Sequence, residues 1–157
     1  MLKKFLRKIV IISVVMVCGL AMLSFFGPDA PVLGVSDGQL SECPGSPNCV
    51  SSMTKLEKFA MDPIPFPSAE DSSANALNKV KQIIAAEFPR ATLTEEDDNY
   101  LRYEVRTFVF RFVDDVEFLA VPQEKLIHFR SASRVGQSDL GANRKRMAKI
   151  KRLMSTE

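Results

Sequence analysis

The residues best suited to chemistry lie in one run near the C-terminus, residues 129–146, where arginines alternate with small polar residues. A guanidinium group presents a planar fork of N–H donors that matches a carboxylate or a phosphate group. The run is also expected to pass from a strand into a helix, and the free N–H groups at a helix start favour anions. The candidate residues for binding an anionic ligand are Arg130, Arg134, Asn143 and Arg144.

The same arginines could equally form an internal lock with nearby acidic residues. The residues between the expected strand and the final helix also suit structural roles, because Gly136 permits a turn and Ser138 or Asp139 can cap the final helix. Gly141 in the first helical turn costs about 1 kcal/mol relative to alanine, which predicts a close approach of its backbone to another element or a ligand. The residues assigned to structural or arginine-pairing roles are Asp114, Asp115, Ser131, Ser133, Gly136, Asp139 and Gly141.

The adjacent residues Asp114 and Asp115 suggest acid–base or metal chemistry, but neighbouring residues of a strand point to opposite faces and cannot form a facing pair. Turn formation or pairing with an arginine is the preferred role. A hydrolase that uses either aspartate with His128 and nearby arginines is the alternative function, since a histidine beside an acid can act as general base. The sequence contains no nucleophile elbow, glycine-rich phosphate loop or metal-binding histidine pair, so no catalytic residue, metal or cofactor is predicted.

A compact motif, residues 42–52, contains Cys43 and Cys49 around two prolines and a glycine. Two cysteines this close in an exported domain predict a disulfide bond. Zinc is a poorer interpretation, because a structural zinc site needs four ligands and the only histidine, His128, is distant in sequence.

The N-terminus predicts a membrane anchor. Residues 1–8 are basic, and residues 9–26 form an uncharged apolar run that would span about 27 Å as a helix, close to the ~30 Å hydrocarbon core of a bilayer. An uncleaved signal anchor is preferred, and a lipoprotein lipidated at Cys18 is the alternative. In both cases the basic flank stays in the cytoplasm. The prediction is a single-pass protein of the bacterial inner membrane with a periplasmic domain.

The chain beyond residue 26 carries 17 basic and 19 acidic groups. A domain this close to neutral is a poor nucleic-acid binder, because affinity for a phosphate backbone comes mainly from accumulated cationic contacts. The expected partners are therefore the membrane, through residues 9–26, and an envelope protein or an anionic lipid or glycan group. The leading hypothesis is a non-catalytic binding or accessory module.

Hydrophobic periodicity predicts two helices, over residues 72–88 and 139–154. Alternation with a period of two predicts strands. Their residue ranges are 91–94, 100–106, 108–113, 116–121 and 126–132. The expected fold is α+β: an antiparallel sheet of about four or five strands with two helices packed on one face, preceded by the membrane helix. The predicted boundaries are 1–26 for the anchor, 27–41 for a tether and 42–157 for the exported domain.

If both helices cover the apolar face of this sheet, the opposite face collects ionisable residues. It would be either a solvated surface with cross-strand ion pairs or an open groove for an anionic ligand. The residues expected there are Arg102, Glu104, Arg106, Glu117, His128 and Arg130. The phenylalanines of the 108–113 strand are expected to pack in the core.

Three ordered motifs, at residues 43–52, 112–118 and 130–144, resemble the DUF1499 family. They read CPGSPNCVSS, FVDDVEF and RSASRVGQSDLGANR. The resemblance covers residues 34–153 and implies an envelope or exported location. The family is one of unknown function, so the resemblance implies no activity and no catalytic residues.

Overall fold

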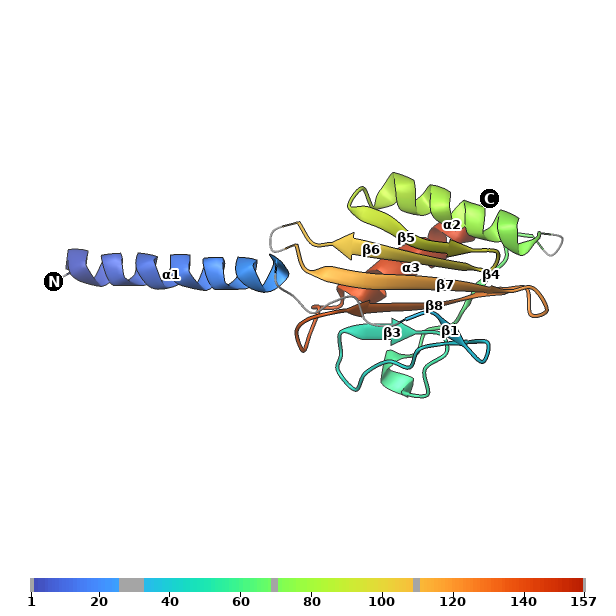
Figure 1. The fold of residues 1–157 in the computed structure, drawn as a ribbon, viewed down its shortest axis with the longest axis horizontal. Helices are drawn as coiled ribbons and strands as arrows, with labels where there is room; N and C mark the ends of the chain where they lie inside the picture. Colours follow the sequence, from blue (N-terminus) through green and yellow to red (C-terminus); the bar gives the residue numbers. More distant parts are fainter. Residues whose placement is uncertain (1, 26–32, 69–70, 109–110, 157) are drawn as a thin grey trace.

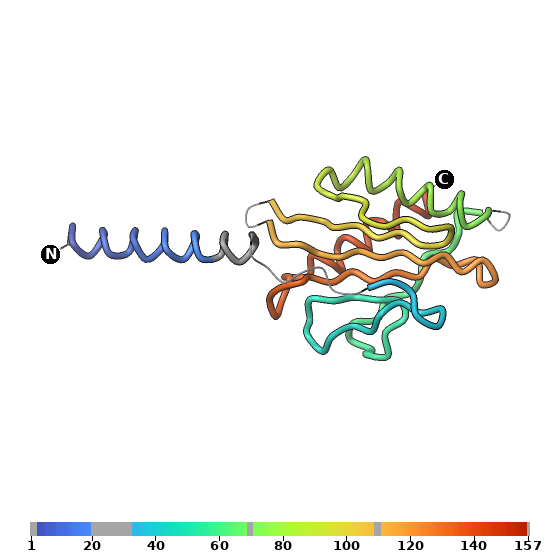
Figure 2. The backbone as a smooth tube through the Cα atoms, viewed as in Figure 1, coloured from blue at the N-terminus to red at the C-terminus, as the bar shows by residue number. Residues whose placement is uncertain are grey.

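The computed structural model describes residues 2–25, 33–68, 71–108 and 111–156, with side chains in the first helix described for residues 3–19. Figure 1 shows two parts: the helix α1 (Leu2–Phe25) and an α+β domain built on one main sheet. The backbone trace in Figure 2 shows the helix as a rod set apart from that domain. Among the described residues, no helix combines the length and apolar content needed to span a bilayer. The membrane anchor over residues 1–26 therefore stays a prediction.

The main sheet is antiparallel, with strands in the order β3-β8-β7-β6-β5 and with β4 paired to the remaining part of β8. The strands are β3 (Cys49–Ser51), β4 (Ile64–Pro65), β5 (Ala91–Asp97), β6 (Tyr100–Arg106), β7 (Val113–Val121) and β8 (Leu126–Ser133). A separate hairpin, β1 (Val35–Ser36) and β2 (Gln39–Leu40), precedes them. The predicted α+β antiparallel class is confirmed, and the described sheet has six strands because two short ones, β3 and β4, were not predicted.

Two helices cover one face of the sheet, α2 (Ser73–Glu87) and α3 (Ala142–Met154), while the 3-10 turn η1 (Glu57–Phe59) follows β3. The Ser72 side chain caps α2 by accepting a hydrogen bond from the Asn75 backbone N–H. One core cluster joins both helices to the sheet. Its members include Leu77, Val80 and Ile84 of α2, Met147 and Ile150 of α3, and Leu101, Val116, Phe118 and Phe129 of the strands.

The predicted strand over residues 108–113 is wrong, because β7 begins only at Val113. The chain turns between β6 and β7, where the Thr107 backbone N–H donates to the Phe112 carbonyl and Arg111 has a φ of 53°. Phe108 is 79% exposed rather than buried, and Phe110 lies outside the described residues. Asp114 and Asp115 consequently lie within β7 and do not form a turn.

The start of α3 also differs from the prediction. The helix begins at Ala142, after Gly141 in a left-handed conformation with a φ of 78°. The Asp139 carboxylate accepts hydrogen bonds from the backbone N–H groups of Gly141 (3.0 Å) and Asn143 (2.7 Å), as a capping residue does. A Cβ atom at Gly141 would meet nothing closer than a lysine carbon at 3.9 Å. The glycine is required by backbone conformation, not by the close approach that was expected.

Candidate functional site

The face of the sheet opposite α2 and α3 carries an ionic network that we call the outer-face network. Strand register places Arg102, Glu117 and Arg130 side by side across β6, β7 and β8, and places Glu104 opposite Asp115. Residues two apart in a strand share a face, so these side chains form one continuous row of alternating charge. The expected collection of charges is therefore present, and its carboxylates are paired with arginines across the strands.

Asp115 is the centre of one half of this network. Its carboxylate accepts hydrogen bonds from Arg134, at 2.8 Å from Nε and 2.9 Å from Nη2, and from Arg102 at 2.9 Å. Burial alone raises the pKa of Asp115, but the hydrogen bonds from Arg134 and Arg102 outweigh it and hold that pKa below its usual value. Arg134 also binds Glu104 at 2.5 Å, and the pKa of Arg134 is raised, chiefly by its hydrogen bond to Asp115.

Glu117 is the centre of the other half and is fully buried. Its Oε1 accepts hydrogen bonds from the Tyr100 hydroxyl at 2.8 Å and from the Gly34 backbone N–H at 3.0 Å. Its Oε2 lies 3.3 Å from Nη1 of Arg130. Burial, followed by the Glu117 charge, raises the pKa of Tyr100, so this phenol stays protonated as a donor.

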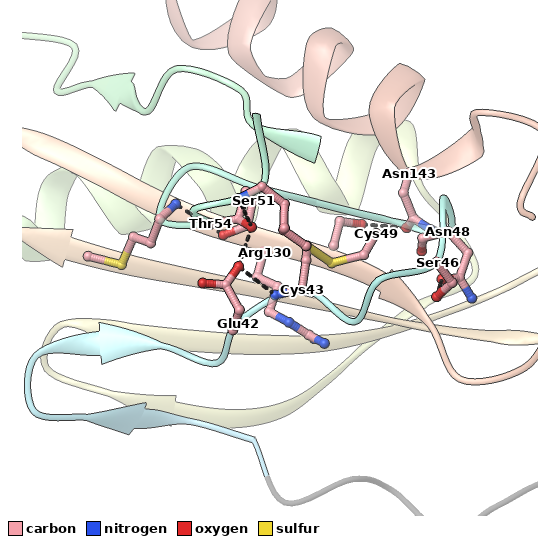
Figure 3. The surroundings of a disulfide bond; sticks show 12 residues. Glu42, Cys43, Ser46, Asn48, Cys49, Ser51, Thr54, Arg130 and Asn143 are labelled. Carbon is pink, nitrogen blue, oxygen red and sulfur yellow. Dashed lines mark hydrogen bonds between the residues drawn. A yellow bond between two sulfur atoms is a disulfide. The ribbon is translucent and has the colours of Figure 1, made fainter. Parts of the chain in front are cut away.

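Arg130 is a member of the outer-face network that is only partly satisfied. It is 7% exposed, and its 3.3 Å contact with Glu117 is its one ion pair among the described residues. Its Nε is buried and has no hydrogen-bond partner. Strand register puts it opposite Ser51, two residues beyond Cys49, and Figure 3 draws it among the surroundings of the disulfide. Buried polar atoms are nearly always hydrogen-bonded, so this guanidinium retains donor capacity for an acceptor.

A second network lies on the helix side of the sheet, beneath α3, and we call it the inner network. Asn143 is fully buried, and its Oδ1 accepts from the Ser131 hydroxyl (2.6 Å) and from Arg146 (2.5 Å). Asp114 accepts from Ser133 at 2.5 Å and from Arg146 at 2.6 Å. Asp114 and Asp115 therefore point to opposite faces, and each is bound by arginine.

The disulfide motif is attached to the inner network. Cys43 and Cys49 form the predicted disulfide, with Cα atoms 5.8 Å apart. Inside the loop, Asn48 donates from Nδ2 to the carbonyls of Gly136 (2.7 Å) and Ser133 (3.3 Å), and Figure 3 shows Ser46 beside it. The loop is thus held against the junction between β8 and α3.

The four predicted ligand-binding residues do not converge on one site. Arg134 is engaged by Asp115 and Glu104 on the outer face, whereas Asn143 is buried on the inner side. The exposed Arg144 donates to the backbone carbonyls of Lys58 (2.9 Å) and Ala60 (3.3 Å). Arg130 alone of the four keeps an unpartnered buried donor.

One constellation was missed by sequence reasoning. The Ser52 hydroxyl lies 3.2 Å from Nδ1 of His128, and Nε2 of His128 lies 3.0 Å from the Glu124 carboxylate. The four-residue spacing between Glu124 and His128 across the β7–β8 turn was the available signal. In the pairing of β7 with β8, His128 lies opposite Leu119, four residues along β7 from Asp115. The proposed aspartate–histidine pair is therefore not assembled. Among the described residues, no cluster of three or more histidine, cysteine or acidic side chains could hold a metal ion.

A family model described as a protein of unknown function, DUF1499, matches residues 39–154. The match includes the disulfide motif, both central strands and α3, so it covers the ionic side chains of both networks. No curated protein and no solved structure gives a significant match to the chain.

Proposed function

Since the chain belongs to the DUF1499 family, whose function is unknown, we propose from the site alone that it is a non-catalytic binding or accessory module of the cell envelope. In this proposal α1 holds the domain at a membrane, and the domain recognises an anionic group on a lipid, a glycan or a protein. The observation that carries the proposal is Arg130, which is almost fully buried yet has one long ion pair and an unpartnered Nε.

The energetics of burial support a ligand at this arginine. An unsatisfied buried polar group costs about 1–3 kcal/mol, and more when it carries charge. The Glu117 carboxylate is shared with Tyr100 and the Gly34 N–H, so it offers Arg130 only one oxygen at 3.3 Å. A carboxylate or phosphate oxygen at the guanidinium would add a charge-assisted hydrogen bond. Recognition of an anion is therefore the role that best fits this side chain.

The membrane part of the proposal rests on the sequence. Four basic residues precede an apolar run, which is the pattern of a single-pass anchor with its N-terminus in the cytoplasm. The domain would then meet its partner close to the membrane surface. Fractionation of cells that express the intact chain tests this. The protein should stay in the membrane fraction after the membranes are washed with alkaline carbonate. A soluble cytoplasmic pool of intact protein would contradict the proposal.

The binding proposal is tested by thermal shift on the full chain with inorganic phosphate, acetate and vesicles containing phosphatidylglycerol. Ligand binding stabilises the folded state by about 2.7 kcal/mol at a hundred times the Kd. The Arg130→Gln variant should lose the shift, and Arg144→Gln, an exposed arginine of the same motif, should retain it. A shift that survives Arg130→Gln in a folded protein would remove Arg130 from the site.

Hydrolysis is the second candidate, and the Ser52–His128–Glu124 arrangement is the observation that favours it. Ser52 can donate to Nδ1 of His128, while Nε2–H of His128 donates to Glu124, which orients the imidazole as a general base. The Phe129 N–H already binds the Ser52 hydroxyl at 2.9 Å, which limits its freedom as a nucleophile. Hydrolysis of p-nitrophenyl acetate that disappears in both Ser52→Ala and His128→Gln, but not in Ser155→Ala, would support an enzyme.

A further inference from the structure

A second surface, separate from both networks, lies where residues 61–67 cross the end of α3, and we call it the strap groove. Its volume is about 730 Å³, within the range of roughly 300–1,000 Å³ that is common for small-ligand sites. Its apolar lining includes Met61, Pro65 and Pro67, which are at least partly exposed, and the buried residues Ile64, Phe66 and Met154. The apolar lining would favour a hydrocarbon chain over a polar ligand.

The charged lining of the strap groove is entirely cationic. Lys79, Lys151 and Arg152 line it, and no carboxylate does. Lys151 contacts the Asp62 carboxylate at 3.3 Å, and the Asp62 side chain is 93% exposed. Lys79 and Arg152 have no acidic partner among the described residues. By contrast, the nearby lysines Lys81 and Lys149 are paired with glutamates at 2.8 Å and 2.5 Å. The groove therefore presents unpaired positive charge next to apolar surface.

Helix chemistry accounts for only part of this charge. Basic residues in the last turn of a helix complement its dipole, which explains Lys151 and Arg152 at the end of α3. Lys79 lies in the middle of α2, and neither helix-end effects nor an ion pair explains its place at the groove. Charges from two different helices thus meet around one apolar cavity.

We propose that the strap groove binds a single-chain anionic amphiphile, specifically a long-chain fatty acid. Its carboxylate would lie among Lys79, Lys151 and Arg152, and its acyl chain would lie along the accessible apolar residues Met61, Pro65 and Pro67. The cationic lining favours a carboxylate, and the apolar lining favours a hydrocarbon chain. This site is independent of Arg130, so either proposal can fail without the other.

The test uses the full chain held in an amphipathic polymer and a hexadecanoate that carries a photoreactive diazirine. Peptide mapping should place the adduct within residues 61–67 or 148–155, and excess hexadecanoate should abolish it. Hexadecylamine, which has the same chain and the opposite charge, should not compete. The double variant Lys79→Glu/Arg152→Glu should lower labelling by roughly tenfold, the change that corresponds to about 1.4 kcal/mol.

The matched control is Lys55→Glu/Lys145→Glu, which changes the net charge equally at exposed positions outside the groove. It should label like the unmodified chain. If circular dichroism shows that Lys79→Glu/Arg152→Glu is unfolded, the neutral variant Lys79→Gln/Arg152→Gln is used in its place. Three outcomes would each overturn the proposal. The adducts could be confined to α1, hexadecylamine could compete as well as hexadecanoate, or the folded groove variant could be labelled as strongly as the unmodified chain.

Discussion

Asn143 on α3 donates from Nδ2 to the backbone carbonyl of Asn48, 3.0 Å away in space and 95 residues earlier in the chain. Asn48 lies inside the disulfide loop and donates in turn to the carbonyl of Gly136, which lies between β8 and α3. The two asparagines therefore join the loop, the end of β8 and α3 into one buried unit. Because buried polar networks destabilise a fold when one member is lost, this unit is expected to be sensitive to substitution.

Asn143→Ala should lower the free energy of unfolding by about 3 kcal/mol, because the Asn48 carbonyl and the Ser131 hydroxyl lose a buried partner. Urea unfolding followed by far-UV circular dichroism measures this. The control is Asn78→Ala, an exposed position of α2, which should stay within about 0.5 kcal/mol of the unmodified chain. Equal effects of the two substitutions would show that the inner network adds nothing to stability.

Asp115 should make stability depend on pH in the acidic range. Its folded-state pKa is lowered, so its contribution is fully present above the unfolded pKa of about 3.9 and is lost as the pH falls through the folded pKa. The stability difference between the unmodified chain and Asp115→Asn should therefore be largest near neutral pH and shrink below about pH 4. Urea titrations between pH 3 and 7 measure it. A constant difference across that range would contradict the assignment, and the exposed Asp98→Asn provides the control.

The disulfide should stabilise the fold by closing a small loop. In the chain-entropy model, a bridge between Cys43 and Cys49 contributes about 2 kcal/mol. The variant Cys43→Ser/Cys49→Ser should therefore unfold at a lower urea concentration, and reduction of the native chain should have a similar effect. Cys18→Ser, which removes the free cysteine on α1, should leave the urea midpoint unchanged.

Gly141→Ala should destabilise the start of α3 by about 1–2 kcal/mol, because an alanine at a φ of 78° is strained even though space is available. Gly45→Ala provides a direct comparison, since Gly45 has no positive φ and a Cβ there meets nothing within 4 Å. That variant should be neutral or stabilised by up to about 1 kcal/mol. Similar midpoints for the two variants would refute the conformational argument.

Local patterns in the sequence were sufficient for most of the secondary structure. The apolar stripe of α2 and the strict alternation of β6 are properties of neighbouring residues, and both elements occur close to their predicted bounds. The disulfide was likewise predictable, because six residues of separation leave the two cysteines little choice of partner. The prediction of a strand over residues 108–113 was wrong, because its alternating phenylalanines have the period of a strand although β7 begins only at Val113.

The sequence by itself determined the antiparallel α+β class, the disulfide and the gathering of charge on one sheet face, since each follows from periodicity or short spacing. Only the tertiary structure decided how those charges are used. Whether Arg134 meets Asp115 or solvent depends on strand register. Likewise, the pairing of Glu117 with Arg130, Tyr100 and Gly34 depends on how three distant segments pack together. These are contacts between distant segments, and their strength depends on burial that no local pattern reveals.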